Sequence, residues 1–347
     1  MLAANPPGTS ATRKTESRLG RGRRHSPALI AALCGLLALV AAVYANHFGN
    51  GFHFDDTHAI VENPYIRSLA NISLFFKDGA ASSTLPPNRT YRPLVTASLA
   101  LDYRLGHGLK PLWFHISTFF WFLVQLGAMF TLFRLVLDRV RPGGAPWVAF
   151  FAAAIYGVHP VMAETVNYVI QRADLYSTLG VVAGMALYAG APKLRRTGLY
   201  LAPVIAGLLS KAPAAVFPAL LFLYIWLFEE NRFGKALVRA LPACLVTGIG
   251  AVFVARMTPP SYVTGATSAF LYRMTQPVVL MGYFRKFFLP LDLSADTDRV
   301  AVTSVFTVDA IGGLAFLAAF AGLAWWCTRK EELRPIAFGM GWFLISS

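Results

Sequence analysis

The sequence predicts an all-α membrane protein whose helices cross the bilayer several times. Hydrophobic residues make up 56% of the 347 residues and charged residues only 14%, whereas about a quarter of an average soluble domain is charged. The apolar residues also gather in runs of about 20, the length of helix that spans the hydrocarbon core of a bilayer. Together these two observations exclude an ordinary soluble domain.

The net charge of +14 indicates an orientation in the bilayer and not nucleic-acid binding. The basic residues form short clusters between the apolar runs, as in the cytoplasmic loops of membrane proteins. Placing every cluster on the cytoplasmic side gives about eight complete spans. These are predicted at 27–45, 112–133, 146–163, 173–191, 198–210, 213–229, 240–256 and 305–327. The three cysteines lie within apolar segments, so we expect neither a disulfide nor a zinc site.

The two ends of the chain differ from this pattern. Residues 1–25 are polar and basic, which predicts a disordered cytoplasmic tail before a membrane domain over 26–347. The apolar run 27–44 is longer than the core of a typical signal peptide, so a retained anchor is favoured over a cleaved signal. The stretch 335–347 is too short to cross, so we expect the chain to be C-terminally truncated.

One apolar region does not fit as a span. The segment 270–290 carries Arg273, Arg285 and Lys286 among aromatic residues. If it crossed, the basic cluster that begins at Arg329 would lie on the outer side. Basic residues spaced through aromatics favour an interfacial or re-entrant helix. The alternative is a true span that inverts everything after it.

Two adjacent carboxylates stand directly after the first span. Asp55 and Asp56 open an outer loop predicted over 46–111. A carboxylate inside a bilayer costs several kcal/mol, so this pair is expected at the interface, facing water or a ligand. The pattern suits a general base or a site for a divalent cation, Mg²⁺ or Mn²⁺. The alternative is a polar cap on a loop.

The same topology places further polar residues on the outer side of the membrane. They are Arg92, His159, Glu164, Arg172, Asp174 and Lys211. Singly, each fits a structural role as a helix end or an interfacial anchor. Together they suit transfer from a lipid-phosphate donor, because arginine and lysine bind phosphate and a carboxylate accepts a proton from a hydroxyl. Without a glycine-rich phosphate loop, nucleotide binding is not expected.

A series of short motifs resembles a known family. In chain order they are Phe54-Asp55-Asp56, Tyr91-Arg92-Pro93-Leu94, Phe114-His115, His159-Pro160-Val161 with Glu164-Thr165-Val166, Arg172-Ala173-Asp174-Leu175, Leu209-Ser210-Lys211 and Phe288-Leu289-Pro290-Leu291 followed by Leu293-Ser294 and Asp296. The series is similar to the membrane half of transmembrane and tetratricopeptide-repeat O-mannosyltransferases and their bacterial relatives. These are GT-C glycosyltransferases.

This resemblance implies inverting transfer of a sugar, mannose or another hexose, from a polyprenyl-phosphate carrier to a hydroxyl of a protein or glycan. It implies catalysis by Asp55 or Asp56 and phosphate binding by Arg172, Lys211 and Arg92, with His159, Glu164 and Asp174 in support. The family often has Lys-Glu after the Leu-Ser, whereas Ala212 follows Lys211 here. No tetratricopeptide repeats are present, so they would belong to a missing C-terminal part.

The arginine-rich start and the compact loops favour a bacterial homologue in the inner membrane, with the outer face in the periplasm. In a eukaryote that face would be the lumen of the endoplasmic reticulum. The alternative functions are a lipid or solute transporter or flippase and a non-catalytic membrane scaffold. Transporters usually have repeated halves, and the sequence shows no internal repeat.

Overall fold

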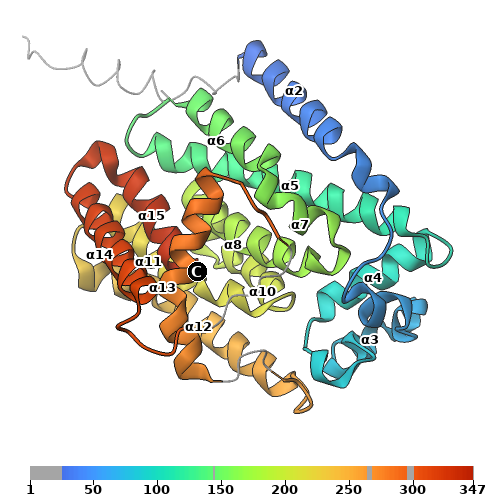
Figure 1. The fold of residues 1–347 in the computed structure, drawn as a ribbon. Coiled ribbons are helices and arrows are strands. Elements are labelled where there is room, and N and C mark those ends of the chain that lie inside the picture. Colours follow the sequence, from blue (N-terminus) through green and yellow to red (C-terminus); the bar gives the residue numbers. More distant parts are fainter. Residues whose placement is uncertain (1–25, 144, 264–267, 295–300, 347) are drawn as a thin grey trace, which may run out of the picture.

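The computed structural model describes residues 26–143, 145–263, 268–294 and 301–346. Within these ranges the protein is all-α, without a β-strand, as the sequence predicts. The predicted cytoplasmic tail, 1–25, lies outside the described residues. Figure 1 shows α2 along one side of the molecule, the outer loop with α3 and α4 at one end, and α14 and α15 at the opposite side.

Helices occupy every segment for which a span was predicted. The longer ones are α2 (Pro27–Val43), α4 (Pro93–Leu105), α5 (Pro111–Asp138), α6 (Pro146–Val158), α8 (Arg172–Gly190), α11 (Phe217–Phe228), α12 (Phe233–Met257), α13 (Ala269–Phe288), α14 (Val308–Thr328) and α15 (Arg334–Ser346). Shorter helices are α3 (Ile72–Phe75), α7 (Ala163–Asn167), α9 (Pro192–Arg196) and α10 (Ala202–Leu208). Proline at the first helical position begins α2, α5 and α6, because its missing N–H is not needed there.

Three described helices are long and apolar enough to cross a membrane: α5, α12 and α14. A fourth span results if α6 and the segment Pro160–Asn167, bent by 51° at the His159-Pro160 break, are taken together. The other predicted spans are shorter or more polar helices, and α13 is not among the candidates. The count of about eight spans therefore stays a prediction.

The packing of α8 between α5 and α10 forms the centre of the bundle. Two glycines of α8 make this contact close. A Cβ at Gly180 would overlap the carbonyl oxygen of Pro203 and lie 2.8 Å from the Cα of Gly207, and one at Gly184 would lie 2.5 Å from the side chain of Val204. Small residues allow helix backbones to approach in this way.

The first part of the outer loop folds into short helical turns that pack against α4. Its buried apolar side chains, Ile60, Ile66 and Phe75, form one cluster with Leu99 of α4 and Phe114 of α5. Burying each such side chain stabilises the fold by about 1.5–3 kcal/mol. This part of the chain is therefore folded, and its apolar core is shared with α4 and α5.

Candidate functional site

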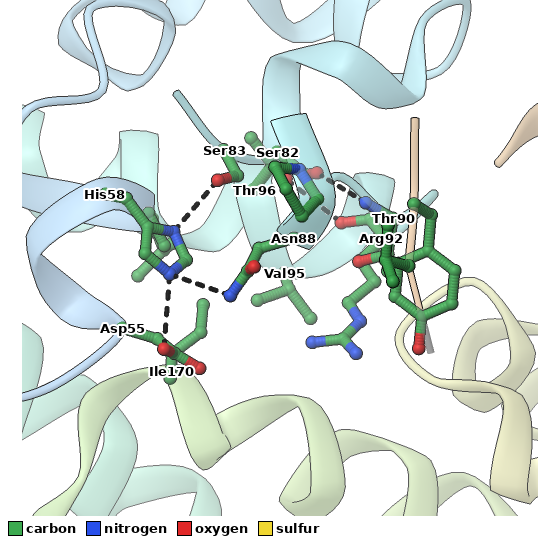
Figure 2. Close-up of a pocket in the computed structure, with 15 residues that line it drawn as sticks. Asp55, His58, Ser82, Ser83, Asn88, Thr90, Arg92, Val95, Thr96 and Ile170 are labelled. Carbon is green, nitrogen blue, oxygen red and sulfur yellow. Dashed lines mark hydrogen bonds and ion pairs between the residues drawn. The ribbon is translucent and has the colours of Figure 1, made fainter. Parts of the chain in front are cut away.

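A polar cavity of about 330 Å³ lies between the outer loop and the helices. Two predicted site residues line it, Asp55 and Arg92. Figure 2 shows the Arg92 guanidinium pointing into the open space on whose other side Asp55 lies. The remaining polar lining comes from His58, Ser82, Ser83, Asn88, Thr90, Thr96 and Tyr262.

Asp55 stands in the turn that leads into a π-helical segment, Thr57–Val61. Its backbone N–H donates to the Tyr168 hydroxyl at 2.8 Å, which fixes the turn against the α7–α8 connection. Its side chain is 56% exposed, and Oδ1 lies 3.2 Å from Nε2 of His58. An exposed carboxylate at the cavity wall is able to accept a proton from a bound hydroxyl.

Asp56 faces the opposite way and is fully buried. Its carboxylate accepts the backbone N–H of His53 at 3.1 Å and that of Ile170 at 2.9 Å. Burial raises the pKa of Asp56 to about 6, against the two backbone hydrogen bonds and the charge of Arg172, which lower it. These contacts make Asp56 a link between the outer loop and the segment before α8.

The two carboxylates do not converge on one point, which does not favour the predicted cation site. A divalent cation needs several oxygen ligands directed at it, whereas both Asp56 oxygens accept backbone N–H groups. In the part of the chain that the structure describes, no group of three or more His, Cys, Asp or Glu side chains is placed to hold a metal ion.

Arg92 is the cation that faces Asp55. Burial lowers the pKa of Arg92, and the negative charges of Asp174 and Asp55 oppose this effect. Among the described residues its guanidinium has neither a hydrogen-bond nor an ion-pair partner. A partly buried arginine with free N–H groups is suited to bidentate binding of a phosphate or carboxylate.

Lys211 and Asp174 form an ion pair, with Nζ 2.5 Å from Oδ2 and side chains 26% and 36% exposed. The pair does not line the polar cavity but borders Arg92. The backbone N–H of Leu94 donates to the carbonyl of Leu209 at 3.4 Å, and Asp174 acts on the charge of Arg92. Arg92, Asp174 and Lys211 thus form one charged group beside the cavity.

Arg172 lies apart from this group, fully buried beneath the outer loop. Its five N–H groups all have partners within the fold. They donate to the carbonyls of Val169 and Phe114, to the hydroxyls of Ser98 and Thr118 and to the carboxylate of Asp102. The structure therefore leaves no N–H group of Arg172 directed at a ligand.

Glu164 lines a second, more apolar cavity of about 620 Å³, and His159 lies beside it against Phe287, which also lines it. Glu164 lines this cavity with Tyr168 and Lys286, and it accepts a hydrogen bond from Gln171 at 2.9 Å. His159 contacts the carbonyl of Phe287 at 2.7 Å and stacks on its ring. The structure does not bring this pair together with Asp55 and Arg92.

Sequence reasoning missed His58, Asn88, Tyr168 and Tyr262. One sequence feature indicates His58, which stands three residues after Asp55. In a helical turn that spacing places two side chains on one face. Asn88 and Tyr262 reach the cavity only through the folding of distant segments, and no local pattern marks them.

These features define an all-helical integral membrane protein with a polar cavity, lined by a carboxylate and an arginine, beside its folded outer loop. The chain is similar to curated protein O-mannosyl-transferases. It is 30% identical over 156 residues to protein O-mannosyl-transferase TMTC3 of Mus musculus, which is 44% of this chain and 16% of that protein. It is 32% identical over 149 residues to protein O-mannosyl-transferase Tmtc2 of Drosophila melanogaster, which is 41% of this chain and 15% of that protein.

A third relative is protein O-mannosyl-transferase TMTC4 of Mus musculus, 29% identical over 39% of this chain and 20% of the relative. These similarities confirm the resemblance to GT-C-type glycosyltransferases that the motifs predict. The matched region spans at most about a fifth of the length of these relatives. No family profile and no solved structure matches the chain.

Proposed function

We propose that this protein is an inverting glycosyltransferase that moves a sugar from a polyprenyl-phosphate carrier to a hydroxyl. The observation that carries the proposal is the placement of Asp55 and Arg92 in one polar cavity beside the bilayer. The relatives' name, protein O-mannosyl-transferase, makes mannose and a protein hydroxyl the first substrates to test.

In the proposed reaction Asp55 accepts the proton of the acceptor hydroxyl. The acceptor oxygen forms a bond to the anomeric carbon of the sugar as the bond from that carbon to the phosphate oxygen breaks. The lipid phosphate leaves with the electron pair, and Arg92 with the neighbouring Lys211 stabilises its charge. No metal ion is required in this scheme, because the arginine and the lysine supply the positive charge.

Asp56 and Arg172 act in this proposal through the fold. Asp56 fixes the turn that carries Asp55, since its carboxylate binds the backbone at His53 and Ile170. Arg172 fixes α8 to the outer loop through Asp102 and to α5 through Thr118. His159 and Glu164 support the second cavity, which lies next to the catalytic turn.

The proposed topology keeps about eight spans, with the basic loops in the cytoplasm and the cavity on the opposite face. In a bacterium that face is the periplasmic side of the inner membrane, and in a eukaryote it is the lumen of the endoplasmic reticulum. Residues 1–25 lie on the cytoplasmic side in this topology.

The test is sugar transfer by the purified natural protein from a mannosyl polyprenyl phosphate to a serine- and threonine-rich peptide. Asp55→Asn keeps the shape of the side chain and removes proton acceptance, so we expect a rate loss of about 10²–10⁴-fold. Asp78→Asn is the matched control, because Asp78 is an exposed carboxylate of the same loop outside the cavity. Full transfer by Asp55→Asn would contradict the proposal, and donor lipid moving between leaflets without transfer would favour the flippase.

A further inference from the structure

We propose that His58 is a positioning residue for Asp55. In this proposal the His58 Nε2–H donates to Oδ1 of Asp55, so that Oδ2 faces the cavity where the acceptor hydroxyl binds. The inference rests on the proposed sugar transfer and goes beyond it by assigning a role to a residue that the predicted site did not include. The two side chains lie 3.2 Å apart at the cavity wall.

The first argument is that the His58 ring is held on both sides. Nδ1 lies 2.9 Å from the Ser83 hydroxyl, and Nε2 lies 3.1 Å from the side-chain amide of Asn88. The backbone is held as well, since the N–H and the hydroxyl of Thr84 both donate to the carbonyl of His58. Figure 2 shows the ring between Ser83, Asn88 and Asp55. A side chain fixed in this way has little freedom left to lose when it binds another group.

The second argument is that the Asp55 side chain is far more exposed than the His58 ring, so it is less confined. It is 56% exposed, whereas His58 is 15% exposed. Besides His58, its carboxylate contacts the Tyr168 hydroxyl, which also accepts the backbone N–H of Asp55. An exposed aspartate samples several rotamers, and only some of them direct an oxygen at a bound hydroxyl. Contact with a fixed donor selects among these rotamers.

The third argument concerns the protons. A neutral imidazole donates from one nitrogen and accepts at the other. The Ser83 hydroxyl lies 2.9 Å from Nδ1 and 3.2 Å from the Leu85 carbonyl, and its one proton is able to go to either. When Nε2–H donates to Asp55, this proton goes to Nδ1, and the Asn88 amide is turned so that its oxygen and not its nitrogen faces Nε2. His58 keeps its own proton throughout, and the acceptor proton passes to Asp55 alone. The only property required of His58 is therefore a hydrogen-bond donor at the Nε2 position.

The experiment compares two amide substitutions in the purified natural protein. In His58→Gln the side-chain amide reaches the Nε2 position and keeps a donor for Asp55, whereas in His58→Asn it reaches only the Nδ1 position, beside Ser83. Both variants stay polar, so both preserve the surroundings of the ring. We expect His58→Asn to lower kcat by about 10–100-fold with less than about a threefold change in KM for the donor, and His58→Gln to recover most of kcat.

His107→Asn is the control, because His107 is an exposed histidine outside the cavity. Equal kcat values for the wild type and His58→Asn would overturn this inference alone. Equal losses in His58→Asn and His58→Gln would also overturn it, since a donor at Nε2 would then be insufficient. Absence of transfer by the wild type would overturn the proposed function, and this inference with it.

Discussion

Arg172 of α8 and Asp102 of α4 form an ion pair in the protein interior, with side chains 0% and 2% exposed. The pair joins the helix that closes the outer loop to the central helix of the bundle. Burying either charge alone would have an unfavourable free energy of desolvation. Here Arg172 also donates hydrogen bonds to two carbonyls and two hydroxyls, which offset it. The arrangement indicates a structural role for Arg172, whereas its sequence motif predicts phosphate binding.

Replacing Arg172 with alanine is expected to destabilise the fold by about 3–5 kcal/mol, because Asp102 would remain buried without its cationic partner. The measurement is the apparent Tm in detergent together with the yield of folded protein. The double variant Arg172→Met with Asp102→Leu removes both charges and should recover part of the loss. A folded Arg172→Ala protein with weakened use of the donor would instead support phosphate binding.

Replacing Arg92 with alanine is expected to weaken use of the donor without unfolding the protein. The guanidinium has no hydrogen-bond or ion-pair partner among the described residues, so its removal breaks no bond of either kind. Loss of a charge-assisted contact to phosphate costs about 1.5–3 kcal/mol, or roughly 10- to 100-fold in kcat/KM. Kinetics at varied donor concentration would measure this. Arg92→Lys keeps the charge and should lose less, and unchanged kinetics in Arg92→Ala would remove Arg92 from the site.

The stability contributed by Asp56 should fall as the pH rises from about 4 to about 6. Burial raises its pKa to about 6, against about 3.9 in an unfolded chain, so in this interval the native state holds a proton that the unfolded state has lost. The contribution is complete below about pH 4 and decreases by roughly 3 kcal/mol by pH 7. The test is the difference in apparent Tm between the wild type and Asp56→Asn across this range. A difference independent of pH would contradict the prediction.

The close contact of α8 and α10 should not tolerate a side chain at position 180. Gly180→Ala would place a methyl group 2.8 Å from the Cα of Gly207, and relieving such an overlap typically costs about 1–3 kcal/mol. Gly127→Ala on α5 is the matched control, because nothing lies within 4 Å of a Cβ there. The control should be neutral or slightly stabilising, since alanine favours a helix by about 1 kcal/mol over glycine. Equal Tm values for both variants would contradict the packing described here.

Reporter fusions are expected to place residues near 75 on the outer side and residues near 140, 195, 235 and 330 in the cytoplasm. The reason is that the basic clusters adjoin the latter positions, and cytoplasmic loops carry an excess of lysine and arginine. A reporter near 290 is also expected on the outer side, because α13 should not cross the membrane. Positions 290 and 330 on sides opposite to these would show that α13 is a span.

The positions of the helices could be predicted from the sequence, because hydropathy and segment length are local properties. The observed α2, α5, α8 and α14 begin within a few residues of the predicted spans. How many of these helices cross the membrane depends on their depth and tilt, which composition does not determine. The bend at His159-Pro160 follows from proline, but its 51° angle depends on packing.

The candidate site could be predicted only in part. Asp55 and Arg92 belong to short motifs, and both line the cavity. Arg172 belongs to a motif of the same kind, but its burial results from Asp102, Phe114 and Thr118, which are 54 to 70 residues away in the chain. A sequence motif does not distinguish an arginine that binds a ligand from one saturated by distant partners. For the same reason Asn88 and Tyr262 could not be found.

Phe54, which precedes Asp55, adopts a left-handed backbone conformation with φ of 47°. A bulky residue rarely adopts this conformation on its own, so the neighbours must hold it. The ring of Phe54 is 71% exposed and contacts Tyr168 edge-on at 5.7 Å, and the same tyrosine receives the N–H of Asp55. The orientation of Asp55 therefore depends on the α7–α8 connection. A ligand that displaces Tyr168 from the second cavity would also turn Asp55 away from the polar cavity.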